Sequence, residues 1–275
     1  MKNVLIFTVH KAGSMFVHRL TDYLTHQLHM PYYSPNKGNF PDYAALSVDL
    51  SHFSGKTGCI GPLRQYWPID NIDSYNVILH LRDPRDMLVS LFFMHTHRTP
   101  GPRRWLRNAI RAYPYPAIWQ LSFKELLDML VLQAKRLGHL GGYQRMRAAR
   151  TGILESGIDR FVMQQADEYY PRYATYCEKL LGKENVTLLR YEDMVLDFDR
   201  WFDEFTQPFG EGAKSAISTL MMNRLRATFQ MQGEDRKSHK RKVTPGDHRE
   251  KLAPETIAAL NERFSDILEA LNYPK

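Results

Sequence analysis

The amino-terminal segment "NVLIFTVHKAGSMF", at residues 3–16, constrains the fold of this chain more than any other stretch. Its first six residues are apolar or β-branched apart from the asparagine, which predicts a short buried strand. Beyond the loop, apolar residues recur every four positions and predict one face of a helix: Phe16, Leu20, Leu24 and Leu28. A strand that passes through a tight loop into a helix is the building unit of a parallel sheet.

The same alternation continues along the 275 residues. Further strands are predicted at 43–52, 75–82 and 185–191. Helices are predicted at 84–95 with Asp83 as N-cap, at 120–137, at 158–181 with a break near Pro171, at 197–206, at 213–229, and from Pro254 to Leu271. The segment 232–250 is predicted to be irregular. Strands that alternate with helices indicate an α/β fold, a central parallel β-sheet flanked by helices on both faces, and we expect residues 1–275 to form a single domain.

Composition narrows the functional classes. No apolar stretch approaches the roughly 20 residues that span a bilayer, and the run "VLIF" is too short to predict a signal peptide. Cys59 and Cys177 are the two cysteines, so neither a disulfide framework nor a cysteine zinc cluster is expected. We therefore expect a cytoplasmic location and no membrane partner. The net charge of +7 suggests an anionic ligand, an acidic surface or nucleic acid, with basic clusters at 98–111 and 236–242.

The loop at residues 8–14 is a candidate anion site. A helix N-terminus offers unpaired N–H groups, Gly13 permits close approach of a ligand, and Lys11 adds a full charge. The lysine precedes the glycine, whereas in the nucleotide-hydrolysing loop G-x-x-x-x-G-K-[ST] it follows two glycines. A surface turn before a helix is the alternative interpretation.

A second candidate is "LRDPRDMLVS" at residues 81–90. Arg82 ends a predicted strand, and Ser90 lies about two turns into the next helix, so that the two suit a phosphate. A surface arginine beside a helix cap would explain the same letters. A third candidate, "RKVTPGDH" at 241–248, places two cations before a Pro-Gly turn.

Together these stretches resemble the sulfotransferases that use 3′-phosphoadenosine 5′-phosphosulfate (PAPS). The loop "TVHKAGSMF" is similar to the family's T-x-P-K-[SA]-G-[ST]-x-[WF], with His10 in place of proline and Met15 in place of a usual threonine. Residues 82–90 match R-[ND]-P-[RK]-D-x-x-x-S at every defined position. "YED" follows a later strand at 191–193, and "RKVTPGDH" resembles R-K-G-x-x-G-D-W without its first glycine and its tryptophan. The resemblance spans residues 3 to about 250 in family order.

The resemblance implies a P-loop-like sheet and an enzyme that transfers a sulfuryl group from PAPS to a hydroxyl or amine of a small-molecule acceptor, releasing 3′,5′-adenosine bisphosphate (PAP) without a metal. By similarity, Lys11 stabilises the leaving oxygen, and the loop and helix start hold the 5′-phosphosulfate through Lys11, Ala12, Gly13, Ser14, Met15 and Phe16. The implied 3′-phosphate ligands are Arg82, Ser90, Arg241 and Lys242. The candidates for adenine contact are Phe16, Tyr191 and Phe229.

The family's general base is a histidine just after a strand between the two phosphate loops, and His52 is the matching candidate, with His10 and Asp49 as alternatives. Residues 95–155 match no family element and are expected to be a helical or lid insertion on the acceptor side. Residues 232–250 are expected to form a basic loop that caps the cofactor.

Three other functions stay open from the residues. The segment 98–120 is rich in arginine and aromatic residues, so it could bind an acidic glycan as the acceptor or line a pocket for an aromatic acceptor. A P-loop phosphotransferase is disfavoured by the position of the lysine and by the absence of a complete Walker sequence. A basic nucleic-acid-binding module is the alternative that is not an enzyme, and on the sulfotransferase hypothesis no nucleic acid partner is expected. A homodimer stays open, because "KLAPETIAALNE" at 251–262 is out of register with the family's dimer motif.

Overall fold

The computed structural model describes residues 2–35, 57–69, 71–97, 140–227 and 244–275. The strand predicted at 43–52 and the helix predicted at 120–137 lie outside these ranges. The chain divides into two compact units, residues 1–91 with 162–275, and residues 92–161. The single domain over residues 1–275 therefore stays a prediction.

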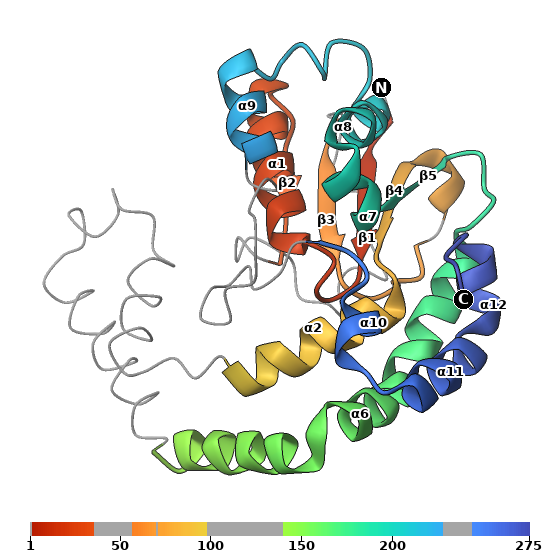
Figure 1. Ribbon diagram of the computed structural model, residues 1–275. Coiled ribbons are helices and arrows are strands. Elements are labelled where there is room, and N and C mark those ends of the chain that lie inside the picture. Colours follow the sequence, from red (N-terminus) through yellow and green to blue (C-terminus); the bar gives the residue numbers. More distant parts are fainter. Residues whose placement is uncertain (1, 36–56, 70, 98–139, 228–243) are drawn as a thin grey trace, which may run out of the picture. The chain divides into compact units, whose positions relative to one another are not determined.

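The described strands of the first unit form one five-stranded sheet with the order β2-β3-β1-β4-β5 (Figure 1). The strands are β1 Val4–Thr8, β2 Tyr32–Tyr33, β3 Cys59–Leu63, β4 Asn76–Leu81 and β5 Val186–Arg190. Every pairing between them is parallel. The predicted α/β class with a parallel sheet is thus confirmed, as are the strands at 3–8, 75–82 and 185–191.

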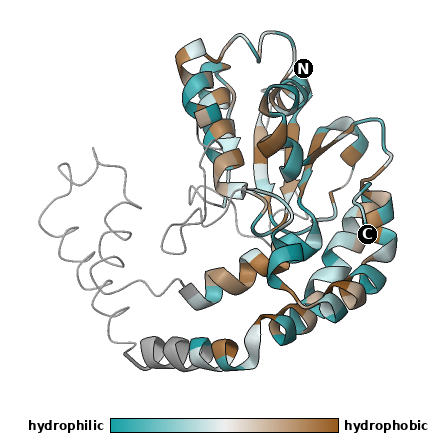
Figure 2. Cartoon of the chain, viewed as in Figure 1, coloured by the Kyte–Doolittle hydropathy of each residue, from teal (hydrophilic) through white to brown (hydrophobic). Residues whose placement is uncertain are grey.

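Both faces of the sheet are covered. Val4 and Ile6 of β1 belong to an apolar core with α1 (Ser14–Gln27) and α8 (Phe198–Thr206). On the other side Phe7 packs against Tyr176 of α6 (Leu140–Lys179), with 6.0 Å between ring centroids. Figure 2 shows hydrophobic residues along the strands, while α1 carries both hydrophobic and hydrophilic residues. Because both faces of the sheet are covered, β1 is a nearly continuous apolar run, and all five of its residues are buried.

The helix after β4 begins where the sequence predicted. It is α2, Pro84–His97, and the Asp83 side chain accepts a hydrogen bond from the Arg85 N–H at 2.9 Å, which confirms Asp83 as the N-cap. The predicted break near Pro171 is wrong, because α6 runs through it and departs from helical geometry at Gly157 instead. The buried side chains of Tyr173 and Tyr176, two and five residues after the proline, hold the helix against the sheet.

The carboxyl-terminal half contains shorter and more numerous helices than the sequence predicts. The region after β5 forms α7 (Tyr191–Leu196), α8, and α9 (Thr219–Ala227). The segment predicted to be irregular includes α10 (Asp247–Lys251). The last predicted helix is two, α11 (Pro254–Arg263) and α12 (Ser265–Ala270), separated at Phe264. No helix within the described ranges is long and apolar enough to cross a membrane.

Candidate functional site

The loop between β1 and α1 has the geometry of an anion-binding turn. Lys11 and Gly13 both adopt left-handed backbone conformations, with φ of 62° and 74°. Among the residues that the structure describes, no side chain caps the start of α1, so the amides of its first turn are in position to bind an anion. A Cβ at Gly13 would lie 2.9 Å from Met194 Cε and 3.3 Å from the Tyr191 ring, which explains why glycine stands here.

Two tyrosines of α6 hold the ends of the neighbouring strands β1 and β4. The Tyr176 hydroxyl donates to the Thr8 carbonyl at 2.9 Å, and the Tyr173 hydroxyl donates to the Arg82 carbonyl at 2.7 Å. Both hydroxyls are buried, and each satisfies a carbonyl just where the chain leaves the sheet. The two predicted phosphate loops are therefore fixed at the same edge of the sheet.

Arg82 joins these loops directly. Its side chain is 3% exposed, and its Nη1 donates to the Lys11 carbonyl at 2.9 Å. The guanidinium carbon lies 4.3 Å from the centroid of the Tyr191 ring, a cation–π contact. Within the described chain the buried Nε of Arg82 has no hydrogen-bond partner. A buried cationic donor without a partner is costly, and an anionic ligand such as a phosphate would satisfy it.

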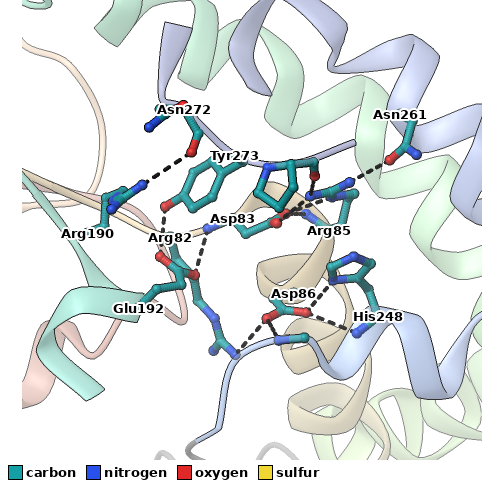
Figure 3. Close-up of polar contacts among 12 residues, drawn as sticks. Arg82, Asp83, Arg85, Asp86, Arg190, Glu192, His248, Asn261, Asn272 and Tyr273 are labelled. Atoms are coloured by element: carbon teal, nitrogen blue, oxygen red, sulfur yellow. Dashed lines mark hydrogen bonds and ion pairs between the residues drawn. The ribbon is translucent and has the colours of Figure 1, made fainter. Parts of the chain in front are cut away.

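Asp86, one helical turn after Arg82, is buried and contacts the turn with which α10 begins (Figure 3). Its carboxylate accepts hydrogen bonds from the N–H of Gly246 at 2.6 Å, the N–H of His248 at 2.9 Å and His248 Nδ1 at 2.6 Å. Burial alone would raise the pKa of Asp86, but the bonds from His248 and the charge of Arg82 hold it well below its ordinary value. The described part of the third sequence candidate, residues 244–248, thus contacts the second.

Arg85 has a structural role instead. It is 1% exposed and pairs with Asp83, 2.6 Å between Nη2 and Oδ2. The same guanidinium donates to Asn261 Oδ1 at 2.6 Å and to the Pro274 carbonyl at 2.7 Å. These contacts fasten the carboxyl terminus to α2 (Figure 3). Of the two arginines in "RDPRD", Arg82 is the one that donates to the loop with Lys11.

The "YED" stretch supports the same loops. Tyr191 is 6% exposed and lies against Arg82, as described above. Glu192 accepts from the Asp83 N–H at 3.1 Å and from the Tyr273 hydroxyl at 2.8 Å. Burial raises the pKa of Glu192 to about 7, against the lowering effect of the Arg82 charge.

The other predicted cofactor residues of the amino-terminal half lie around the start of α1 and α2. Ala12 and Ser14 are buried, and Met15 is partly exposed. Phe16 is partly buried and packs against Phe198 and Trp201, at 6.2 and 6.1 Å between ring centroids. Ser90 is partly exposed on α2.

The candidates for the general base are divided between the described and undescribed ranges. The His10 ring lies edge-on to Tyr169, with 6.3 Å between centroids. The remaining predicted residues lie outside the described ranges: Asp49, His52, Phe229, Arg241 and Lys242.

Sequence reasoning missed Arg64, which directly follows β3. Its Nε donates to Ser14 Oγ at 3.4 Å, and its Nη2 lies 3.8 Å from Met15 Sδ. A second cation therefore lies beside the first turn of α1. An arginine directly after an apolar run would have been a signal, but Gly61 and Pro62 hid the strand that precedes it.

This chain is similar to solved structures and to a family model. A mouse sulfotransferase complexed with PAP matches with a TM-score of 0.53 and 13% identity, over 97% of this chain and 84% of that one. Retinol dehydratase in complex with androsterone and inactive cofactor PAP matches with a TM-score of 0.47 and 14% identity, over 97% and 80%. No curated protein matches significantly. The sulfotransferase domain family matches residues 71–272, which is more than half of the chain and includes Arg82, Ser90 and Tyr191. This chain therefore belongs to the sulfotransferase family.

Proposed function

We propose that this protein transfers a sulfuryl group from PAPS to a hydroxyl or amine of a small-molecule acceptor. The observation that carries the proposal is the contact between the two phosphate loops. Arg82 donates to the Lys11 carbonyl, and its buried Nε has no partner in the described chain. A basic pair at adjacent strand ends suits a ligand with two separate anionic groups.

Each residue has a distinct part in this proposal. PAPS supplies a sulfuryl group that is already activated on a phosphate leaving group. Lys11 places a cation where negative charge develops on the leaving oxygen, and Ser14 with the first turn of α1 binds the 5′-phosphate. Arg64 adds a charge at the same end of the helix. Arg82 and Ser90 bind the 3′-phosphate, which carries about −1.5 to −2 charges near neutral pH.

The remaining assignments rest on the sequence resemblance. Arg241 and Lys242 complete the 3′-phosphate site. Phe16, Tyr191 and Phe229 edge the adenine, and the partly exposed ring of Phe16 supports its part in this. His52 is the proposed base, with His10 and Asp49 as alternatives. The unpaired thiols Cys59 and Cys177 support the proposed cytoplasmic location, where disulfides are rare.

Calorimetric titration with PAP tests the cofactor site, with Arg82→Ala and Lys11→Ala beside the unmodified protein. Charge-assisted bonds are worth roughly 1.5–3 kcal/mol, so Arg82→Ala is expected to weaken PAP binding about 10- to 100-fold. Turnover of PAPS over a panel of hydroxyl and amine acceptors, followed by mass spectrometry, tests the transfer.

The matched control is Arg200→Ala, which removes the same charge from an exposed ion pair with Glu204 on α8. This variant is expected to bind PAP as the unmodified protein does. Absence of PAP binding, or equal affinities in the Arg82 and Arg200 variants, would refute the proposed function. Retained turnover in His52→Ala would remove only the assignment of the base.

A further inference from the structure

The carboxylate of Asp86 is held by three donors of residues 246–248, the turn with which α10 begins. Two are backbone N–H groups, from Gly246 and His248, and the third is His248 Nδ1 at 2.6 Å. Asp86 is 1% exposed and His248 is 3% exposed. An ionised carboxylate only accepts hydrogen bonds, so the proton of this contact lies on Nδ1. The turn therefore fixes both oxygens of Asp86.

His248 distinguishes this chain from the family pattern it resembles. The motif G-D-W has tryptophan at the position where "PGDH" has His248. A buried imidazole is an expensive group unless it is hydrogen-bonded, and here its partner is the acidic residue of the 82–90 stretch. The contact joins residues that are 162 positions apart in the chain.

The consequence concerns Arg82. The Arg82 Nη2 and Asp86 Oδ2 atoms lie 3.9 Å apart, close enough for attraction but too far for a hydrogen bond. An unrestrained carboxylate one turn away would instead form a bidentate pair with the guanidinium and occupy its donors. Because Asp86 is engaged by the turn, its charge orients Arg82 and leaves the donors of Arg82 available to a ligand.

Two further contacts complete the restraint. The Lys11 carbonyl accepts from Nη1 on one side, and the Tyr191 ring covers the guanidinium on another. The buried Nε is left without a partner in the described chain. Glu192 also acts on Arg82 through its charge, but Asp86 is the carboxylate that lies one helical turn away, 3.9 Å from the guanidinium. The placement of Asp86 therefore decides between orienting Arg82 and neutralising it.

We infer that His248 is a positioning residue: it restrains Asp86 so that Arg82 keeps its donors for the 3′-phosphate of the cofactor. This inference rests on the proposed function, in which Arg82 binds that phosphate. It predicts that His248 determines how strongly the protein prefers an adenine nucleotide with a 3′-phosphate over one without it.

The test compares the affinities for PAP and for adenosine 5′-monophosphate, which lacks the 3′-phosphate. His248→Ala is expected to lower PAP affinity about tenfold and to change the affinity for the monophosphate less than about twofold. His248→Asn keeps an N–H donor near the position of Nδ1 and is expected to recover most of the preference. In an Asp86→Asn background, His248→Ala is expected to have no further effect on the ratio of affinities.

Asn261→Ala is the matched control, because it removes another, partly buried anchor between α2 and the carboxyl-terminal segment without touching Arg82. It is expected to lower thermal stability and to leave the ratio unchanged. The inference would be overturned if His248→Ala left the ratio of the affinities for PAP and adenosine 5′-monophosphate unchanged, or if Asn261→Ala lowered that ratio equally. The proposed function would stand in both cases. If the unmodified protein itself does not prefer PAP, the proposed function and this inference both fail.

Discussion

Replacing Glu192 with glutamine is expected to change how the stability of the protein depends on pH. Glu192 connects three parts of the site, accepting from the Asp83 N–H and the Tyr273 hydroxyl beside Arg82. A glutamine has the same size, and its amide oxygen still accepts from Asp83 while its NH₂ group donates to the Tyr273 oxygen. The substitution therefore removes the ionisation and keeps the contacts.

The magnitude follows from the pKa. Burial, opposed by the charge of Arg82, raises the pKa of Glu192 from 4.5 to about 7. Between these values the folded chain keeps a proton on Glu192 that the unfolded chain has released. Stability then falls as pH rises through this window, by about 3 kcal/mol in total, because one pKa unit corresponds to about 1.4 kcal/mol. Above pH 7 both states are ionised and the effect is constant.

Urea unfolding of both proteins at pH 5 and pH 8 measures this effect. The free energy of unfolding of Glu192→Gln, relative to that of the unmodified protein, is expected to be about 2–3 kcal/mol higher at pH 8 than at pH 5. Other titrating groups cancel in this difference, including His80, whose buried imidazole acts in the opposite direction below pH 6.5. A difference in unfolding free energy that is the same at both pH values would refute the reasoning.

Three other substitutions, at Gly13, His80 and Tyr173, test the residues that support the site. Gly13→Ala is expected to cost about 1–3 kcal/mol of stability and to weaken PAP binding. The reason is that φ at Gly13 is 74° and that the new Cβ would lie 2.9 Å from Met194 Cε. Unchanged thermal unfolding and an unchanged PAP titration would contradict this. Burial lowers the pKa of His80 to about 3, so the folded state loses stability as pH falls from 6.5 to 3 while the unfolded chain takes up a proton. His80→Leu is expected to flatten acid unfolding over this range, and an equally steep curve would argue against it. Tyr173→Phe removes the donor to the Arg82 carbonyl and is expected to cost about 1–3 kcal/mol in urea unfolding together with some PAP affinity; loss of neither would show that the bond is dispensable.

Local signals were enough to predict the parts of the site that are contiguous in the chain. β1, its loop and α1 occupy residues 4–27 without interruption, and the same is true of β4, Arg82 and α2. In each case an apolar run, a cap or glycine, and a helical period follow one another directly. Their meeting at one edge of the sheet followed from the parallel order of the strands, which is a property of the fold class.

Contacts between distant segments could not be read in this way. "RDPRD" contains two arginines, and the sequence alone does not show which of them binds a ligand. Arg85 is occupied by Asn261 and by the Pro274 carbonyl, 176 and 189 positions away. Arg82 meets the Lys11 carbonyl, 71 positions away. Only tertiary packing separates the arginine that fastens the carboxyl terminus from the one that belongs to the site.

Strand β3, which pairs with β1, affects which residue can be assigned as the general base. Glycine and proline are poor strand formers, so the residues "CIGPL" do not predict a strand, whereas the pattern at 43–52 does. By resemblance to the family, the general base is a histidine just after a strand between the two loops, which makes His52 the candidate. Two described strands lie between those loops, β2 and β3, and neither is directly followed by His52. β3 begins at Cys59, after His52, and the residue that directly follows it is Arg64. That position therefore contributes a permanent cation near Ser14, which favours binding an anion over accepting a proton. His52 remains a prediction that depends on its own variant, and His10, beside Lys11, is the alternative for which a ring contact is known.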